Sequence, residues 1–196
     1  MKEELIKMKN VLMLVDTLKG FRTIGPMAVP GLEHTDEAIE ELVIFAIENG
    51  YEIISIEEGH TENSIEFNDY PPHAINGTEE AELIDRLKPY RKYMKVIKKN
   101  STSGFVTKEY QEYLEANKYV IRRIVYCGYL FDICVPNVAI PTKMFFNENN
   151  IPCEVIVPEN TTETFDSPTH PRKEYKTLAK KMLLLNGIKV PEKYEG

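Results

Sequence analysis

The sequence predicts an α/β protein with three layers, in which helices cover both faces of a mainly parallel central sheet of about five to six strands. Three observations support this prediction. Short apolar runs alternate with segments of helical periodicity along the chain. The runs carry apolar side chains at consecutive positions, as strands buried on both faces do. Polar residues of several chemical types directly follow these runs, where open α/β sheets bind their ligands.

Five segments have the length and composition of strands. Residues 11–15 are continuously apolar and are followed by Asp16, which indicates a strand buried on both faces. The others are residues 53–56, 94–97, 121–126 and 154–157. Because these runs are separated by helical segments, we expect their connections to be crossovers between parallel strands.

Five longer segments are predicted to be helical, namely residues 36–49, 78–87, 107–117, 134–149 and 171–186. In the first, apolar residues recur at helical spacing and Asn49-Gly50 provides a stop signal. Glu79 and Glu80 suit the first turn of the second, because acidic side chains interact favourably with the helix dipole there. Pro141 lies inside the fourth, where it removes a backbone donor, so we expect a bend or a shorter helix.

The composition indicates one globular domain spanning residues 1–196. The chain has 42% hydrophobic and 28% charged residues, which is ordinary for a globular protein with a substantial core. Its net charge of -7 argues against nucleic acid and anionic membranes as partners. No apolar run approaches the roughly 18 residues that are needed to span a bilayer.

We expect a cytoplasmic protein. Residues 1–10 contain acidic side chains and no long apolar core, so they do not resemble a signal peptide. Three cysteines without a CxxC pair fit a reducing compartment better than a set of disulfides. We further expect the protein to act on a small molecule and to assemble as a homo-oligomer.

Residues 125–136 carry the most informative pattern of the chain. An apolar strand runs into Gly128, and Cys134 then stands at the predicted start of a helix, two residues before Pro136. A helix start offers unpaired backbone N–H groups and the positive end of a dipole, and both favour a thiolate. Cys134 is thus a candidate nucleophile. The alternative is a small buried side chain, which is the commoner role of a cysteine.

Other reactive groups stand at the ends of the remaining strands. They are Asp16 after the first strand, Glu58 and His60 after the second, and Lys98 or Lys99 after the third. Because the carboxyl ends of parallel strands share one edge of the sheet, we expect these groups to lie close to Cys134. For Asp16 and the lysine, an ion pair with a purely structural role is the alternative.

The spacing within these segments is similar to that of a known family. Asp16 and Phe21 stand five positions apart, as in the family's opening motif, and Lys99 precedes Phe105 by six positions, as in its lysine segment. This register selects the second of the two lysines. Asp132-Ile133-Cys134-Val135 is similar to the family's nucleophile motif. Over about residues 10 to 187, the chain resembles the isochorismatase-like cysteine hydrolases, and most closely the nicotinamidases among them.

The resemblance implies a catalytic triad of Asp16, Lys99 and Cys134. In such a triad the cysteine attacks the substrate carbonyl, the aspartate carries the proton, and the lysine favours the thiolate. The resemblance also implies that the backbone N–H groups of Leu130 and Cys134 bind the oxyanion, and that the peptide between Tyr129 and Leu130 is cis.

A metal site in the loop after the second strand is implied as well. Glu58-Gly59-His60 resembles the family's Asp-x-His motif, Pro71-Pro72-His73 resembles its Pro-x-His motif, and Glu66 stands where some nicotinamidases have a fourth ligand. Two imidazoles and two carboxylates suit Zn²⁺, our first choice, or Mn²⁺ or Fe²⁺. Glu58 departs from the family, which has Asp at this position. The alternative is that all four are solvated loop residues.

The function implied by the resemblance is metal-dependent hydrolysis of nicotinamide to nicotinate and ammonia through a thioester on Cys134. Phe21 and Tyr70 match positions that sandwich the pyridine ring, with core packing as the alternative. Two other functions stay open: hydrolysis of another small amide, such as a carbamoyl or ureido compound, and ligand binding by an inactive protein of the same fold. Isochorismate hydrolysis fits less well, because that chemistry does not need a cysteine.

The remaining polar and sulfur groups have structural roles in this interpretation. Cys127 lies within a strand and Cys153 at the start of one, where small buried side chains are common. Asp166 and His170 belong to the last long loop, and we expect them to orient that loop and to cap the final helix.

Overall fold

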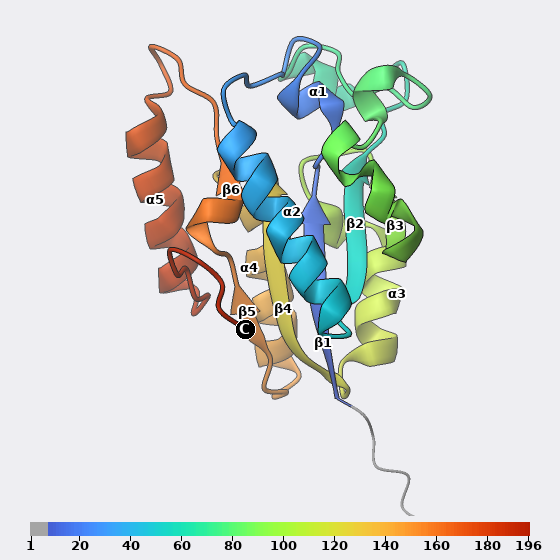
Figure 1. Ribbon diagram of the computed structural model, residues 1–196, viewed down its shortest axis with the longest axis vertical. Coiled ribbons are helices and arrows are strands. Elements are labelled where there is room, and N and C mark those ends of the chain that lie inside the picture. The colour runs from blue at the N-terminus through green and yellow to red at the C-terminus, as the bar shows by residue number, and fades with distance from the viewer. Residues whose placement is uncertain (1–7) are drawn as a thin grey trace, which may run out of the picture.

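The computed structural model describes residues 8–196 and contains a central parallel sheet with strand order β3-β2-β1-β4-β5, in which β6 also pairs with β4 (Figure 1). The strands are β1 (Lys9–Val15), β2 (Glu52–Glu58), β3 (Met94–Lys99), β4 (Ile121–Tyr129), β5 (Glu154–Ile156) and β6 (Thr162–Glu163). All five predicted strands are present, and β6 was not assigned from the sequence. The predicted α/β class and parallel sheet are confirmed.

Five α-helices and several short 3-10 segments connect the strands. The α-helices are α1 (Lys19–Arg22), α2 (Glu33–Glu48), α3 (Lys108–Asn117), α4 (Cys134–Glu148) and α5 (Arg172–Leu185). The 3-10 segments are η1 (Ile65–Asn68), η2 (Glu79–Ala81), η3 (Asp85–Tyr93), η4 (Gly104–Val106) and η5 (Glu159–Thr161). Among the described residues, no helix has both the length and the hydrophobicity for a membrane crossing.

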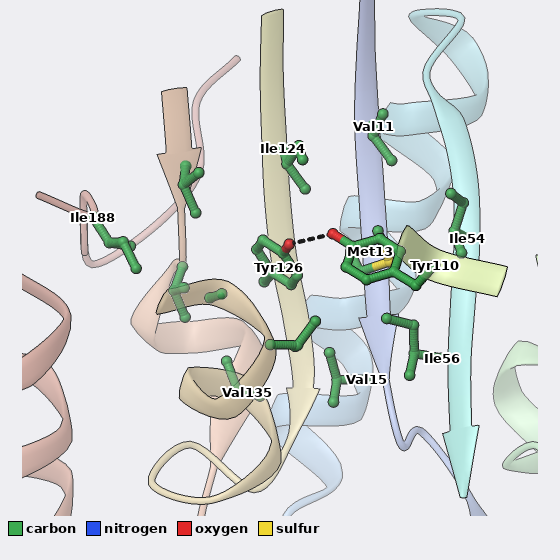
Figure 2. Close-up of a cluster of buried hydrophobic side chains, with 14 of the residues drawn as sticks. Val11, Met13, Val15, Ile54, Ile56, Tyr110, Ile124, Tyr126, Val135 and Ile188 are labelled. Carbon is green, nitrogen blue, oxygen red and sulfur yellow. Dashed lines mark hydrogen bonds between the residues drawn. The ribbon is translucent and has the colours of Figure 1, made fainter. Parts of the chain in front are cut away.

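The helices lie on both faces of the sheet because side chains alternate along each strand. Val11, Met13 and Val15 of β1 pack in a cluster with residues of α3, α4 and α5. Leu12 and Leu14 point to the opposite face and pack in a cluster with residues of α2. Figure 2 shows part of the first cluster, in which the hydroxyl groups of Tyr110 and Tyr126 are hydrogen-bonded at 2.7 Å. The result is the predicted three-layer arrangement.

Strands β1 and β4 approach each other closely where the sheet ends. Val15 is paired with Gly128 in their parallel register. Gly128 has a φ of +110°, and a Cβ atom there would lie 2.0 Å from the carbonyl oxygen of Val15. A glycine is therefore required at this position. This contact lies next to two functional segments: Asp16 directly follows β1, and Tyr129, at the end of β4, leads into the turn before Cys134.

The prediction of one helix over residues 78–87 was wrong. The segment forms η2 and the start of η3, with Glu82 in an extended conformation between them. Tertiary hydrogen bonds explain the break, because Lys19 donates its backbone N–H to the carbonyl of Glu82, and Ile84 donates to the carbonyl of Thr17. These bonds outweigh the local helical preference of the acidic residues.

Helix α4 continues through Pro141, so of the two outcomes that we expected, a bend or a shorter helix, the shorter helix is not found. Proline leaves the carbonyl four residues earlier without its usual N–H donor. Here that carbonyl belongs to Asn137, and it accepts a hydrogen bond of 2.7 Å from the hydroxyl of Ser103. The side chain from the neighbouring loop replaces the missing donor, which explains how the helix tolerates the proline.

Substitution of Gly128 by alanine should destabilise the protein strongly. The positive φ and the collision with the Val15 carbonyl together should lower the free energy of unfolding by about 3 kcal/mol or more. Gly50→Ala is a matched control, because Gly50 also has a positive φ but no heavy atom lies within 4 Å of the added Cβ. We expect it to cost about 1 kcal/mol. Urea denaturation of both variants measures the difference, and equal losses would contradict the close-approach argument.

Candidate active site

The carboxyl ends of β1 and β3 and the start of α4 bring the three predicted triad residues together. Asp16 follows β1, Lys99 ends β3, and Cys134 begins α4. The Lys99 Nζ atom lies 2.8 Å from Asp16 Oδ2 and 3.9 Å from Cys134 Sγ. A carboxylate oxygen of Asp16 and the sulfur of Cys134 lie within 4.8 Å of each other. All three side chains are buried.

The structure distinguishes the two candidate lysines. Lys98 points away from the triad, is about half exposed and forms an ion pair with Glu57 at 3.0 Å. Lys99 points inward and is fully buried at its side chain. The opposite directions follow from the alternation of side chains along β3, and they place Lys99 beside Cys134, as the motif register predicts.

Glu58 joins the triad as a fourth ionisable group. Its Oε1 atom lies 2.6 Å from Lys99 Nζ and 3.8 Å from Cys134 Sγ. Its backbone N–H donates a hydrogen bond of 2.7 Å to Asp16 Oδ1. One ammonium group therefore serves two buried carboxylates. Sequence motifs placed Glu58 in the metal site and did not predict this second contact.

The charges in this cluster oppose one another, and the pKa values reflect it. Burial, with a contribution from the charge of Glu58, raises the pKa of Asp16 to about 7, although Lys99 acts in the other direction. For Glu58, burial is outweighed by Lys99, His60 and His73, which together hold its pKa well below the usual range. Asp16 is thus the carboxylate with a proton affinity suited to exchange near neutral pH.

Burial also raises the pKa of the Cys134 thiol well above its usual value, even though Lys99 acts to lower it. Cys134 does stand at the first position of α4, as predicted. The position at a helix start does not bring the thiol pKa below its usual value, because the cost of burying the charge is larger here. The sulfur needs a neighbouring base to lose its proton, and Asp16 is within reach.

The turn between β4 and α4 presents two backbone donors. The N–H groups of Leu130 and Cys134 have no hydrogen-bond acceptor among residues 8–196. The peptide between Tyr129 and Leu130 is cis, as the family resemblance implies. The turn is held by backbone bonds from Phe131 to the carbonyl of Glu163 at 3.0 Å and from Val135 to that of Leu130 at 3.2 Å. Its free donors are suited to an oxyanion.

The four predicted metal ligands also converge. Each of the four side chains offers a ligand atom within 4.8 Å of the other three, namely those of Glu58, His60, Glu66 and His73. Glu58 Oε2 lies 2.8 Å from His73 Nε2 and 3.3 Å from His60 Nε2. The other ring nitrogen of each histidine, Nδ1, is also hydrogen-bonded. His73 Nδ1 lies 2.8 Å from the carbonyl oxygen of Pro71, and His60 Nδ1 lies 3.0 Å from Asn100 Oδ1.

One oxygen in this cluster supports a cation site directly. Glu66 Oε2 accepts a hydrogen bond from the backbone of Thr102, but Glu66 Oε1 is buried and has no hydrogen-bond partner among the described residues. A buried unpaired carboxylate oxygen is costly unless a cation or a proton meets it. The donor set of two imidazoles and two carboxylates therefore fits a divalent metal of the zinc, manganese or iron type.

A pocket opens beside Cys134 and the metal-type cluster, by which we mean Glu58, His60, Glu66 and His73. It is lined by Phe21, Met27, Glu58, Glu66, Tyr70, His73, Thr102, Leu130, Ile133 and Cys134. The ring of Phe21 meets the ring of His73 edge-on at 5.5 Å, and that of Tyr70 does so at 6.4 Å. Both aromatic residues named from the sequence thus form pocket walls. The lining contains two carboxylates and neither a lysine nor an arginine side chain.

Comparison with known proteins agrees with this site. A family model described as the isochorismatase domain matches residues 10–182. The chain belongs to the isochorismatase family. Nicotinamidase 1 of Arabidopsis thaliana is 30% identical over 182 residues, which covers 84% of this chain and 73% of that protein. The resemblance inferred from the sequence motifs is confirmed, and the family match together with the nicotinamidase relatives indicates a hydrolase of amide C–N bonds.

Solved structures show the same fold. The nicotinamidase of Bacillus subtilis superposes with a TM-score of 0.77 at 25% identity, covering 94% of this chain and 100% of that one. The pyrazinamidase of Pyrococcus horikoshii, solved in complex with zinc, gives a TM-score of 0.76 at 22% identity, with coverage of 95% and 99%. The isochorismatase-family fold is therefore shared along nearly the whole chain.

Three pocket residues of this isochorismatase-family protein were not predicted. Ile133 and Thr102 lie within the nucleophile and lysine segments, so attention to the neighbours of the motif residues could have found them. Met27 belongs to a loop without any motif, and no sequence signal identifies it. Met27 and Ile133 add apolar surface to the pocket walls.

The last long loop is attached to the nucleophile turn. His170 Nε2 lies 2.6 Å from Asp132 Oδ2, and its ring is stacked between Phe165 and Tyr175 at centroid distances of 3.8 and 3.6 Å. Asp132 also accepts a hydrogen bond of 2.6 Å from the hydroxyl of Thr164. The predicted orienting role of His170 thus extends to the turn itself.

Asp166 has the capping role that we expected. It accepts the backbone N–H of Arg172, the first residue of α5, at 3.0 Å. This bond satisfies one of the free donors at the helix start.

Replacement of His170 by phenylalanine should separate the stacking from the hydrogen bond. The aromatic stack is retained, but Asp132 loses a partner, so the free energy of unfolding should fall by about 1.5 to 3 kcal/mol. His34→Phe on the exposed surface of α2 is the control and should change it by less than about 0.5 kcal/mol. Urea denaturation gives both values. A His170→Phe protein as stable as the control would show that the bond to Asp132 contributes nothing.

Proposed function

We propose that this amidase hydrolyses nicotinamide to nicotinate and ammonia through a thioester on Cys134, and that it needs a divalent metal ion. The proposal is supported by the similarity to two nicotinamidases, from A. thaliana and B. subtilis. The structural observation that carries it is the content of one pocket, where a cysteine, two aromatic walls and a metal-type cluster face the same space.

The pocket chemistry favours a neutral heteroaromatic amide over an anionic one. Phe21 and Tyr70 offer flat apolar contacts to a ring. Glu58 and Glu66 repel a negative charge, and the lining offers no lysine or arginine to receive one. A carbamoyl amino acid would bring its own carboxylate into this environment at a considerable cost. Among the alternatives left open by the sequence, an uncharged carbamoyl or ureido compound stays compatible with the walls.

The proposed reaction begins with a proton transfer from Cys134 to Asp16, whose pKa of about 7 suits it to hold that proton. Lys99 stabilises the thiolate as it forms. The sulfur then attacks the amide carbon, and the N–H groups of Leu130 and Cys134 receive the developing oxyanion. Collapse of this intermediate expels ammonia, which takes the proton from Asp16. A water molecule then adds to the thioester and gives one proton to Asp16. Collapse of this second intermediate breaks the C–S bond and releases the acid, and the Cys134 thiolate recovers the proton from Asp16.

The metal proposal rests on Glu58, His60, Glu66 and His73, which would hold the ion. When bound, the ion supplies a Lewis acid that can accept a ring nitrogen and lower the pKa of a bound water. Zn²⁺ is our first choice, and the zinc complex of the P. horikoshii pyrazinamidase supports it. The unpaired Oε1 atom of Glu66 supports a cation at this place, from within this chain.

An inactive binding protein of the same fold is less well supported. The ammonium of Lys99 and the carboxylate of Asp16 lie in contact, and the sulfur of Cys134 is within reach of both. Burying such charged groups together is costly, and a hydrophobic cluster would stabilise the fold at least as well. Catalysis gives a reason for keeping them.

Replacement of Cys134 by alanine should abolish ammonia release from nicotinamide. Without the nucleophile we expect the rate to fall by about a thousandfold or more, while the circular dichroism spectrum stays unchanged. Cys127→Ala is the matched control, since this cysteine is equally buried and lies away from the triad in β4. A coupled assay for ammonia gives the rates. Turnover by the Cys134→Ala protein would rule out the thioester mechanism.

Removal of a metal ligand should lower the metal content of the protein. We expect Glu66→Gln and Glu58→Ala each to weaken zinc binding by at least about tenfold, whereas Glu62→Gln, at an exposed position of the same loop, should leave it unchanged. Elemental analysis after dialysis against a weak chelator measures the difference. Full zinc occupancy in either ligand variant would remove that residue from the ligand set.

A further inference from the structure

A buried polar network lies just outside the groups that the proposed reaction uses. It consists of Arg22, Asp36 and Tyr129, which are 2%, 8% and 0% exposed. Arg22 belongs to α1, Asp36 to the first turn of α2, and Tyr129 to the end of β4. Three elements that are distant in sequence thus meet at one carboxylate.

Asp36 accepts every strong bond in this network. Its Oδ1 atom accepts the hydroxyl of Tyr129 at 2.6 Å and Nε of Arg22 at 2.8 Å, and its Oδ2 atom accepts Nη2 of Arg22 at 2.6 Å. The guanidinium group also donates to the carbonyl of Val29 and lies 5.5 Å from the ring centre of Tyr129. Such a bidentate pair with a third donor fixes direction as well as distance.

Each partner of Asp36 is covalently adjacent to a residue of the pocket. Arg22 follows Phe21, which forms an aromatic wall against His73. Tyr129 precedes Leu130, whose backbone N–H faces the expected oxyanion. The Asp36 carboxylate therefore holds the residue next to the Phe21 wall and the residue next to the Leu130 donor.

Stability alone does not explain the network. A buried ion pair costs about as much in lost hydration as it returns, and apolar side chains would fill the same space well. Catalysis, in contrast, depends on the distance between the substrate ring and the oxyanion donors, because small displacements of the reacting groups slow a reaction strongly.

We propose that Asp36 is a positioning residue for amide hydrolysis, which sets the Phe21 wall through Arg22 and the Leu130 donor through Tyr129. This inference rests on the proposed reaction, since it assigns Leu130 to the oxyanion and Phe21 to the ring. Asp36 touches neither the substrate nor the reacting atoms, and it acts through its two partners.

The two branches should have different kinetic signatures. Tyr129→Phe frees the turn that presents Leu130, and because this donor meets charge only in the transition state, kcat should fall roughly tenfold with KM nearly unchanged. Arg22→Lys keeps a positive charge but loses the bidentate geometry. It frees the Phe21 wall, so KM should rise roughly tenfold with a smaller effect on kcat. Asp36→Asn should show both changes.

The test is a set of steady-state measurements with nicotinamide on the zinc-loaded full chain. Tyr126→Phe is the matched control, because Tyr126 is equally buried on the same strand and its hydroxyl bonds to that of Tyr110, within the core cluster of α3 and α4 (Figure 2). Thermal unfolding of each variant verifies that it is folded at the assay temperature. If Tyr129→Phe does not fold, Arg22→Lys decides the question by its KM.

The outcomes distinguish a failure of the proposed function from a failure of the positioning role of Asp36. An inactive wild-type protein would overturn the proposed function. With an active wild type, a tenfold loss of kcat for Tyr129→Phe and none for Tyr126→Phe supports the positioning role. Equal kcat values for the two tyrosine variants, or an unchanged KM for Arg22→Lys, would overturn it and leave the network as a structural one.

Discussion

The rest of the site depends on the ion pairs that the ammonium group of Lys99 forms with two carboxylates. This group lies between the carboxylates of Asp16 and Glu58, with the sulfur of Cys134 beside it, and all four side chains are buried. Two carboxylates cannot both stay ionised in such a place without a cation between them. Lys99 lowers the pKa of both carboxylates, and the two histidines then divide their roles. The added bonds from His60 and His73 hold Glu58 ionised, whereas burial and the charge of Glu58 leave Asp16 as the group that exchanges protons.

The parallel sheet makes this arrangement possible without any loop having to fold precisely. Strands β3, β2 and β1 are neighbours, and each contributes one charged side chain where it ends. The fourth group arrives from β4, the strand on the other side of β1, through a short turn. Sites built on the ends of rigid strands hold their geometry better than sites on loops. The metal-type cluster extends this rigid part through Glu58, its shared member.

Much of this site could be predicted from the sequence because motif spacing and strand ends carry the information. The sequence spacings from Asp16 to Phe21 and from Lys99 to Phe105 aligned the chain with the family motifs. The shared edge of the parallel sheet then predicted that Asp16, Lys99 and Cys134 lie close together. The prediction of a helix over 78–87 was wrong because local helix propensity does not include the backbone hydrogen bonds that this segment makes with residues 17 and 19. Met27 and Asp36 could not be found, since their roles arise from long-range contacts and no local pattern marks them.

The proline in α4 has a consequence for how the sequence of this protein can change. Pro141 leaves the carbonyl of Asn137 without a helical donor, and this carbonyl accepts a hydrogen bond from the hydroxyl of Ser103. The gap in the helical bonds of α4, which begins at Cys134, thus attaches the helix to the loop that follows Lys99. The acceptor is a backbone atom, and residue 137 can therefore vary without loss of the contact. Positions 103 and 141 are linked instead. In diverging relatives they should co-vary, with a hydroxyl residue at 103 wherever a proline stands at 141.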